Sequence, residues 1–183
     1  FRNMYQYVDF FVINIVCTTS TKPYEPRNVE ELRNIIEPLF EFRRGQPDYR
    51  PILLKISPDL TREELDAIVD VLIETPLDGI EAVAGSTAMA KELGYTTGGA
   101  ITGAMLTEKA IETVRYIATK TEHNYPIIGS GGMMTPDDIK RMMAAGASLV
   151  ALNTGLREGG MRLLKAATKS LRQTPITETK NRA

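Results

Sequence analysis

The sequence predicts an α/β fold in which parallel strands alternate with helices. Short apolar runs recur along the chain, and the segments between them carry apolar residues at helical spacing. Glycine clusters and polar runs follow the carboxyl ends of most of these runs, which is the edge where parallel α/β proteins bind ligands. These observations fit both an open sheet and a sheet closed into a barrel.

Five apolar runs are the predicted strands. They are rich in Ile, Val, Leu or Phe and alternate little with polar residues, which is typical of strands covered on both faces. The runs are residues 9–14, 52–56, 79–83, 126–129 and 148–152. The connection over residues 84–104 is long and glycine-rich, and loops of this length in compact domains usually have a function.

Capping signals predict where the helices begin. Asn28 with Glu31 and Thr61 with Glu64 have capping-box spacing, and Thr135 precedes a proline at the first helical position. Pro38 lies inside the first helical pattern and predicts a kink or an end there. Two further helices are expected over about residues 107–117 and 161–171.

Composition narrows the class of protein. The 183 residues are 43% hydrophobic and 25% charged with a net charge of −1, so the basic excess of a nucleic-acid binder is missing. One cysteine, Cys17, and one histidine, His123, leave no disulfide framework and no Cys/His-rich metal site. Without a bilayer-length apolar stretch or a signal peptide, the expected location is cytoplasmic.

Two glycine turns predict a phosphate site. Gly131 and Gly132 follow one strand, and Thr154 and Gly155 follow the next strand along the chain. Glycine lets the backbone approach an anion, and free N–H groups at a helix start point toward it. Turns of this kind at adjacent strand ends match the phosphate site that barrels build from their last two strands. Two ordinary glycine turns are the alternative.

Three side chains near strand ends are candidates for chemistry. Lys55 lies inside an apolar strand, where a charge is costly unless it is paired or directed at a ligand; an edge position is the alternative. Asn14 raises the same question, with a buried structural amide as its alternative. Cys17 follows the first strand among polar residues and is either a small buried side chain or a general base.

The ordered segments LLKISPDLTREELDAI, DGIEAV, GGAITG, PIIGSGG and AGASLVALNTGL resemble the carboxyl-terminal half of dihydroorotate dehydrogenase. The resemblance covers about residues 7–171 and is closer to the class 2, quinone-linked branch. It implies part of an FMN-containing (β/α)8 barrel over residues 1–174, with five strands corresponding to barrel strands four to eight. The composition of residues 175–183 separately predicts a flexible tail. The fold alternative is an open, flavodoxin-like five-stranded parallel sheet.

The resemblance also implies an activity, the oxidation of dihydroorotate to orotate in pyrimidine biosynthesis. Cys17 would remove a proton, hydride would pass to FMN, and Asn14 would contact the substrate. Lys55 would lie against the flavin ring, Thr102 and Gly103 would approach it, and the later residues would hold the phosphate. The residues that the resemblance assigns to FMN are Lys55, Thr102, Gly103, Gly131, Gly132, Asn153, Thr154 and Gly155.

The sequence departs from the family pattern at two substrate amides. Thr19 and Ala84 stand where the family has asparagine, and Asn153 replaces a family tyrosine. These changes leave two alternatives: a flavin- or phosphate-binding paralogue without turnover, and an FMN oxidoreductase with another small substrate. A quinone is one candidate electron acceptor.

The start of the sequence gives a last expectation. Phe1 is followed within about ten residues by a strand, which suggests that the chain begins inside a longer protein. Five parallel strands would expose two open edges, so the rest of the barrel or a homo-oligomer partner is expected. Peripheral membrane contact through an amino-terminal region outside these residues is a further expectation.

Overall fold

The computed structural model describes residues 1–16, 29–95 and 97–172, which form one parallel sheet. Its strands are β1 (Phe11–Asn14), β2 (Ile52–Ile56), β3 (Gly79–Ala82), β4 (Ile127–Gly129) and β5 (Leu149–Val150). They lie side by side in sequence order, and each neighbouring pair is parallel. Sequential order is that of a barrel wall, whereas a doubly wound sheet reverses its order at a switch point. The topology therefore supports the barrel portion over the flavodoxin-like alternative.

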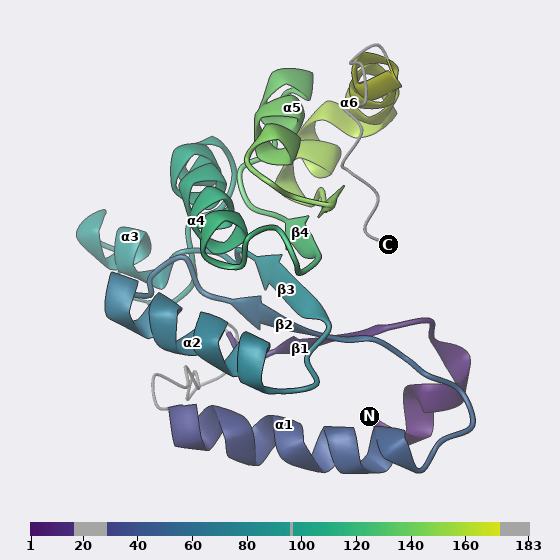
Figure 1. Ribbon diagram of the computed structural model, residues 1–183. Helices are drawn as coiled ribbons and strands as arrows, with labels where there is room; N and C mark the ends of the chain where they lie inside the picture. The colour runs from purple at the N-terminus through teal and green to yellow at the C-terminus, as the bar shows by residue number, and fades with distance from the viewer. Residues whose placement is uncertain (17–28, 96, 173–183) are drawn as a thin grey trace.

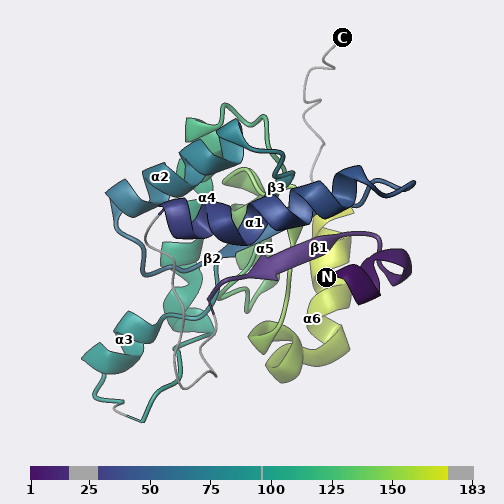
Figure 2. The same cartoon turned by 90° about the horizontal axis from the view of Figure 1, so that it is seen from below.

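Helices follow the strands and cover one side of this sheet. They are α1 (Val29–Arg44), α2 (Arg62–Glu74), α3 (Thr87–Glu92), α4 (Thr107–Lys120), α5 (Pro136–Ala144) and α6 (Thr154–Arg172), with 3-10 segments η1 (Arg2–Tyr7) and η2 (Ala104–Leu106). Figure 1 shows α1, α2, α4 and α5 along the outer side of the curved sheet, and in Figure 2, which is seen from below, α1 lies in front of the sheet. Among the described residues, no helix is long and apolar enough to cross a membrane.

The two faces of the sheet differ in burial. Ile52, Leu54 and Ile56 of β2 are fully buried against the helices, as is Ile80 of β3. Side chains of alternate strand positions point to the opposite, concave face. On that face Leu149 is 62% exposed in this chain. The helix-covered face is thus the hydrophobic core, and the concave face is left for a ligand or for further protein.

The capping predictions hold wherever the structure describes them. The Thr61 hydroxyl accepts from the backbone N–H of Glu64, and the Glu64 carboxylate accepts from that of Thr61. Thr135 and Asp138 make the same reciprocal pair at the start of α5. Each such cap stabilises a helix by about 1 kcal/mol. Asn28 lies outside the described residues.

Of the two effects predicted for Pro38, an end of the helix is wrong, because α1 continues through it to Arg44. Pro38 is on the exposed side of the helix, so the carbonyl that loses its partner faces water. Leu32, Ile36 and Phe40 are buried on the opposite side and hold both halves of the helix against the core. Tertiary packing therefore outweighs the local cost of the proline.

The last helix contains the predicted segment and is preceded by a further helical turn. α6 starts at Thr154, and the backbone of Gly160 leaves helical geometry with φ of 58° and ψ of −156°. The predicted segment from Met161 to Leu171 follows this break. The turn before the break is the part of α6 that reaches the site described below.

A partly buried ion pair joins the amino-terminal ends of β2 and β3. The Arg43 guanidinium donates to the Asp78 carboxylate at 2.6 Å and to the Pro76 carbonyl at 2.6 Å. The same carboxylate accepts from the backbone N–H of Ile52 at 2.7 Å. Burial, together with a hydrogen bond to Asp78, raises the pKa of Tyr49 above its usual value. This end of the sheet is stabilised by polar contacts, and the opposite end is open for binding.

Candidate functional site

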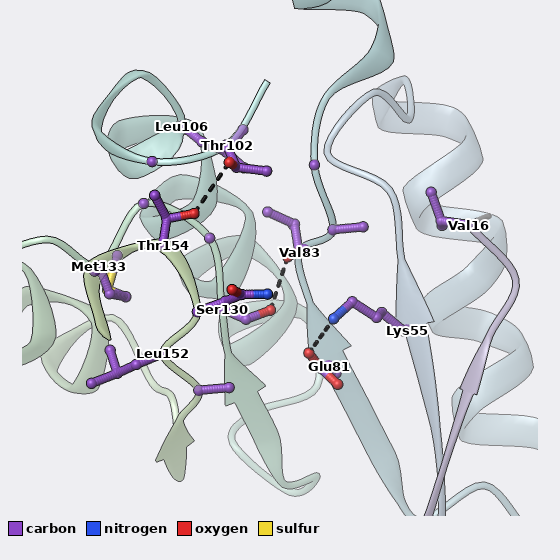
Figure 3. Close-up of a pocket in the computed structure, with 18 of the residues that line it drawn as sticks. Val16, Lys55, Glu81, Val83, Thr102, Leu106, Ser130, Met133, Leu152 and Thr154 are labelled. Atoms are coloured by element: carbon purple, nitrogen blue, oxygen red, sulfur yellow. Dashed lines mark hydrogen bonds and ion pairs between the residues drawn. The ribbon is translucent and has the colours of Figure 1, made fainter. Parts of the chain in front are cut away.

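A pocket of about 400 Å³ lies at the carboxyl ends of the strands. Its walls come from the carboxyl ends of β1, β2 and β3, from the residues that follow β4 and β5, from the long connection over residues 84–104 and from the start of α6. Figure 3 shows side chains from these elements pointing toward a common space. Pockets of this size hold small-molecule ligands in other proteins.

The pocket brings together the residues that the sequence predicts as a site. Those that line it are Asn14, Lys55, Thr102, Gly103, Gly131, Gly132, Asn153, Thr154 and Gly155. Cys17, the predicted general base, lies outside the described residues, as does Thr19. Ala84, one of the departures from the family pattern, also lines the pocket.

Lys55 is held by a carboxylate that the sequence reasoning did not single out. The strand register places Lys55 beside Asn14 of β1 on one side and beside Glu81 of β3 on the other. The Lys55 ammonium donates to the Glu81 carboxylate, and the two side chains are 24% and 13% exposed. β2 is an internal strand of the sheet, so the edge-position alternative for Lys55 is wrong. Glu81 had the same signal as Lys55, a charge within an apolar strand.

Asn14 ends the first strand at the rim of the pocket. Its side-chain oxygen accepts from the backbone N–H of Val16 at 3.0 Å, a local contact that turns the chain at the end of the strand. The residue is exposed rather than buried, so it is not the buried structural amide that was the alternative.

Close backbone packing forms the other end of the pocket. Gly132 has φ of +75°, and a Cβ at that position would lie 2.4 Å from the backbone nitrogen of Thr107. A Cβ on Gly155 would lie 2.0 Å from the Met133 carbonyl oxygen. The Thr107 hydroxyl donates to the Gly132 carbonyl at 2.5 Å and fixes the turn further. These positions require glycine because any side chain would collide with backbone.

The start of α6 supplies donors to this glycine cradle, by which we mean Gly131, Gly132, Thr154 and Gly155. The amino-terminal turn of a helix has backbone N–H groups without helical partners and a partial positive charge. The first turn of α6 contains no acidic side chain to neutralise that charge. The cradle therefore has the chemistry of an anion site.

The long connection folds back over the pocket. Ser86 and Ile101 exchange two backbone hydrogen bonds of 2.9 and 2.8 Å. A Cβ on Gly85 would lie only 2.9 Å from the Cβ of Ala100, so the two arms of the connection touch. The Thr154 hydroxyl donates to the Thr102 hydroxyl at 3.1 Å and joins the connection to α6. Thr102 and Gly103 are thereby placed beside the cradle.

Asp59 anchors the start of the connection. Its carboxylate accepts from the Ser86 hydroxyl at 2.5 Å and from the backbone N–H groups of Thr87 and Ala88 at 2.7 and 2.9 Å. The Lys109 ammonium lies 3.5 Å away, and the Asp59 side chain is 4% exposed. Burial alone would raise the pKa of Asp59, but these hydrogen bonds and the lysine outweigh it and hold the pKa below its usual value.

Ser130 is a second residue that the sequence reasoning missed. Its hydroxyl donates to the Val83 carbonyl at 2.8 Å, and Val83 in turn donates its N–H to the Ser130 carbonyl at 2.8 Å. These bonds join the ends of β3 and β4 beneath the pocket. Ser130 lies between Gly129 and Gly131 in the predicted phosphate turn, and this position was the signal that could have identified it.

Comparisons with known proteins agree with this arrangement. The family model described as dihydroorotate dehydrogenase matches residues 1–174. The dihydroorotate dehydrogenase (quinone) of Christiangramia forsetii is 33% identical over 169 residues, which cover 90% of this chain and 49% of the relative. That of Thermosynechococcus vestitus is 35% identical over 191 residues, with coverage of 98% and 51%.

Solved structures show the same fold. Ligand-free DHODH from Eimeria tenella superposes with a TM-score of 0.83 at 24% identity, over 92% of this chain and 52% of that one. The complex of the Eimeria tenella enzyme with ferulenol gives 0.81 at 24% identity, over 91% and 50%. The chain spans about half the length of the curated relatives it matches. Because the family model covers nearly all of the sequence, the chain belongs to the dihydroorotate dehydrogenase family.

Proposed function

We propose that the pocket binds FMN and takes part in the oxidation of dihydroorotate to orotate in pyrimidine biosynthesis. The observation that carries the proposal is the convergence of Lys55 and the glycine cradle on one pocket, although they are far apart in sequence. The relatives from Christiangramia forsetii and Thermosynechococcus vestitus are dihydroorotate dehydrogenases (quinone), which supports a quinone as the electron acceptor.

The residues present fit an FMN molecule. The cradle combines backbone that only glycine allows with the start of α6, and this combination suits a terminal phosphate. At the other end, Lys55 and Glu81 of the strands supply the polar side chains. We assign Gly131, Gly132, Thr154 and Gly155 to the phosphate, with Asn153 beside them. Lys55, Thr102 and Gly103 are assigned to the ring system.

Bound FMN would supply the acceptor for a hydride, and side chains of this protein would orient the substrate and remove its proton. Asn14 would orient the substrate through its amide group. Cys17 would take a proton from a substrate carbon, which requires the thiolate form. The Lys55 ammonium would face the ring system, and the positive charge that it presents there depends on its ion pair with Glu81.

A second candidate is an FMN oxidoreductase with another small substrate, or an FMN-binding protein without turnover. Ala84 favours it, because a methyl group there cannot donate the hydrogen bonds of the asparagine that the family has. Titration of the FMN-loaded protein with orotate separates the candidates. A spectral change with saturable binding supports dihydroorotate as the substrate, and its absence favours the second candidate.

Two measurements test the main proposal. The purified protein should show a flavin absorption spectrum or take up added FMN, and a colourless protein that binds no FMN would refute the proposal. The variant Cys17→Ala should retain FMN yet lose reduction of the flavin by dihydroorotate. Unchanged reduction by this variant would show that another group removes the proton.

A further inference from the structure

We infer that Glu81 is a positioning residue that orients the Lys55 ammonium and cancels its charge toward the cofactor. The inference rests on the proposed FMN binding and deepens it, since it concerns how strongly the pocket stabilises negative charge on the ring. Glu81 would affect this stabilisation indirectly, through its contact with the Lys55 ammonium.

The charge inventory of the pocket is the first observation. Among the described residues that line it, Lys55 and Glu81 are the charged ones. Their formal charges sum to zero, so these walls are neutral rather than cationic. An unpaired lysine would instead give the pocket one positive charge.

The sheet itself fixes this pair. Lys55 and Glu81 are direct partners in the register of β2 and β3, and neighbouring strands lie about 4.8 Å apart. The backbone of the sheet therefore holds the two side chains next to each other, so little conformational freedom is lost when the ion pair forms. Figure 3 shows the ammonium turned toward the carboxylate within the pocket.

Burial determines how strongly the pair acts. The side chains are already only 24% and 13% exposed, and a ligand that fills the pocket would remove more water from them. Coulomb attraction between opposite charges grows as water is displaced, so the ammonium would stay with Glu81 when FMN binds. A negative charge that develops on the ring would then face a lysine whose positive charge is neutralised by Glu81.

The variant Glu81→Gln separates this role from a structural one. Glutamine keeps the length of the side chain and a carbonyl that accepts from Lys55, but it removes the negative charge. Bound anions should therefore gain affinity. If Glu81 mattered only for packing, its loss would loosen the site and weaken binding instead, so the two explanations predict opposite signs.

Sulfite is the probe, because it adds to protein-bound flavins and leaves negative charge on the ring. In the FMN-loaded protein, Glu81→Gln should bind sulfite about tenfold more tightly than the natural chain, the scale of one charge-assisted hydrogen bond. For a two-electron couple this corresponds to a rise of about 30 mV in midpoint potential. Glu37→Gln, an exposed glutamate of α1, is the matched control and should change neither value.

Lys55→Gln and the double variant give a charge series. Sulfite affinity should rank Glu81→Gln above the natural chain, the double variant near the natural chain, and Lys55→Gln lowest. If Glu81→Gln does not fold, the double variant must still bind sulfite more tightly than Lys55→Gln does. Equal or weaker affinity on loss of Glu81, with FMN retained, overturns the inference and leaves FMN binding intact. Failure of the natural chain to bind FMN overturns both.

Discussion

The glycine cradle makes a quantitative prediction at Gly132. In Gly132→Ala the new methyl group would lie 2.4 Å from the backbone nitrogen of Thr107 and 2.5 Å from its Cα. Relief of such an overlap costs about 1–3 kcal/mol in packed interiors. The left-handed backbone, with φ of +75°, adds about 1–2 kcal/mol for a residue with a side chain. We therefore expect a loss of about 2–5 kcal/mol in the free energy of unfolding.

Gly94→Ala is the matched control for this variant. Gly94 has φ of +83°, and a Cβ there would meet nothing within 4 Å, so only the backbone strain of about 1–2 kcal/mol should remain. Urea unfolding measures both variants. Circular dichroism is the suitable signal because the chain has no tryptophan.

The same variants test the cradle by binding. Gly132→Ala should weaken FMN binding at least tenfold, because the turn that presents its backbone donors must move. Gly94→Ala should bind FMN as the natural chain does. If Gly132→Ala unfolds no more easily than Gly94→Ala and binds FMN equally well, the close approach of the turn to Thr107 is not the constraint described here.

Two further variants test the polar anchors at opposite ends of the sheet. Asp59→Asn should lose about 2 kcal/mol at neutral pH, because an amide cannot accept every bond that the carboxylate accepts. Because the pKa of Asp59 is lowered in the folded protein, its contribution to the free energy of unfolding is complete above the ordinary value of 3.8 and is lost as the pH falls through the folded value. Urea unfolding at a series of acidic pH values should therefore show a shallower pH dependence in Asp59→Asn than in the natural chain. An identical pH dependence would contradict this. Arg43→Met should lose about 3 kcal/mol of the free energy of unfolding, because it leaves the Asp78 carboxylate without its cation. Thermal unfolding should show that the double variant Arg43→Met/Asp78→Asn is more stable than Arg43→Met alone. A double variant no more stable than the single one would rule out the pair as the cause.

The strands and most of the site could be predicted from the sequence because both depend on local patterns. The apolar run over residues 52–56 is a strand with the same bounds in the structure, and each of the other four runs contains a shorter strand. In a parallel sheet the carboxyl ends meet at one rim, so polar residues after different strands must gather there. That is why Lys55 and Gly155 line one pocket.

Features that depend on distant contacts could not be predicted in the same way. The continuation of α1 through Pro38 depends on Ile36 and Phe40 packing against the core, which local propensity does not describe. The charge of Glu81 was visible in the sequence, but its register with Lys55 is a property of the assembled sheet. Cys17 lies outside the described residues, and its role stays a prediction.

The anchoring of the 84–104 connection has a practical consequence. Asp59 anchors its first residues, and the Ser86–Ile101 pair closes it into a loop. Near that tip, a Cβ at Gly94 or Gly98 would point into open space. We expect a short peptide tag inserted there to leave Thr102 in place, because the hydrogen bonds between Ser86 and Ile101 lie between the tip and Thr102.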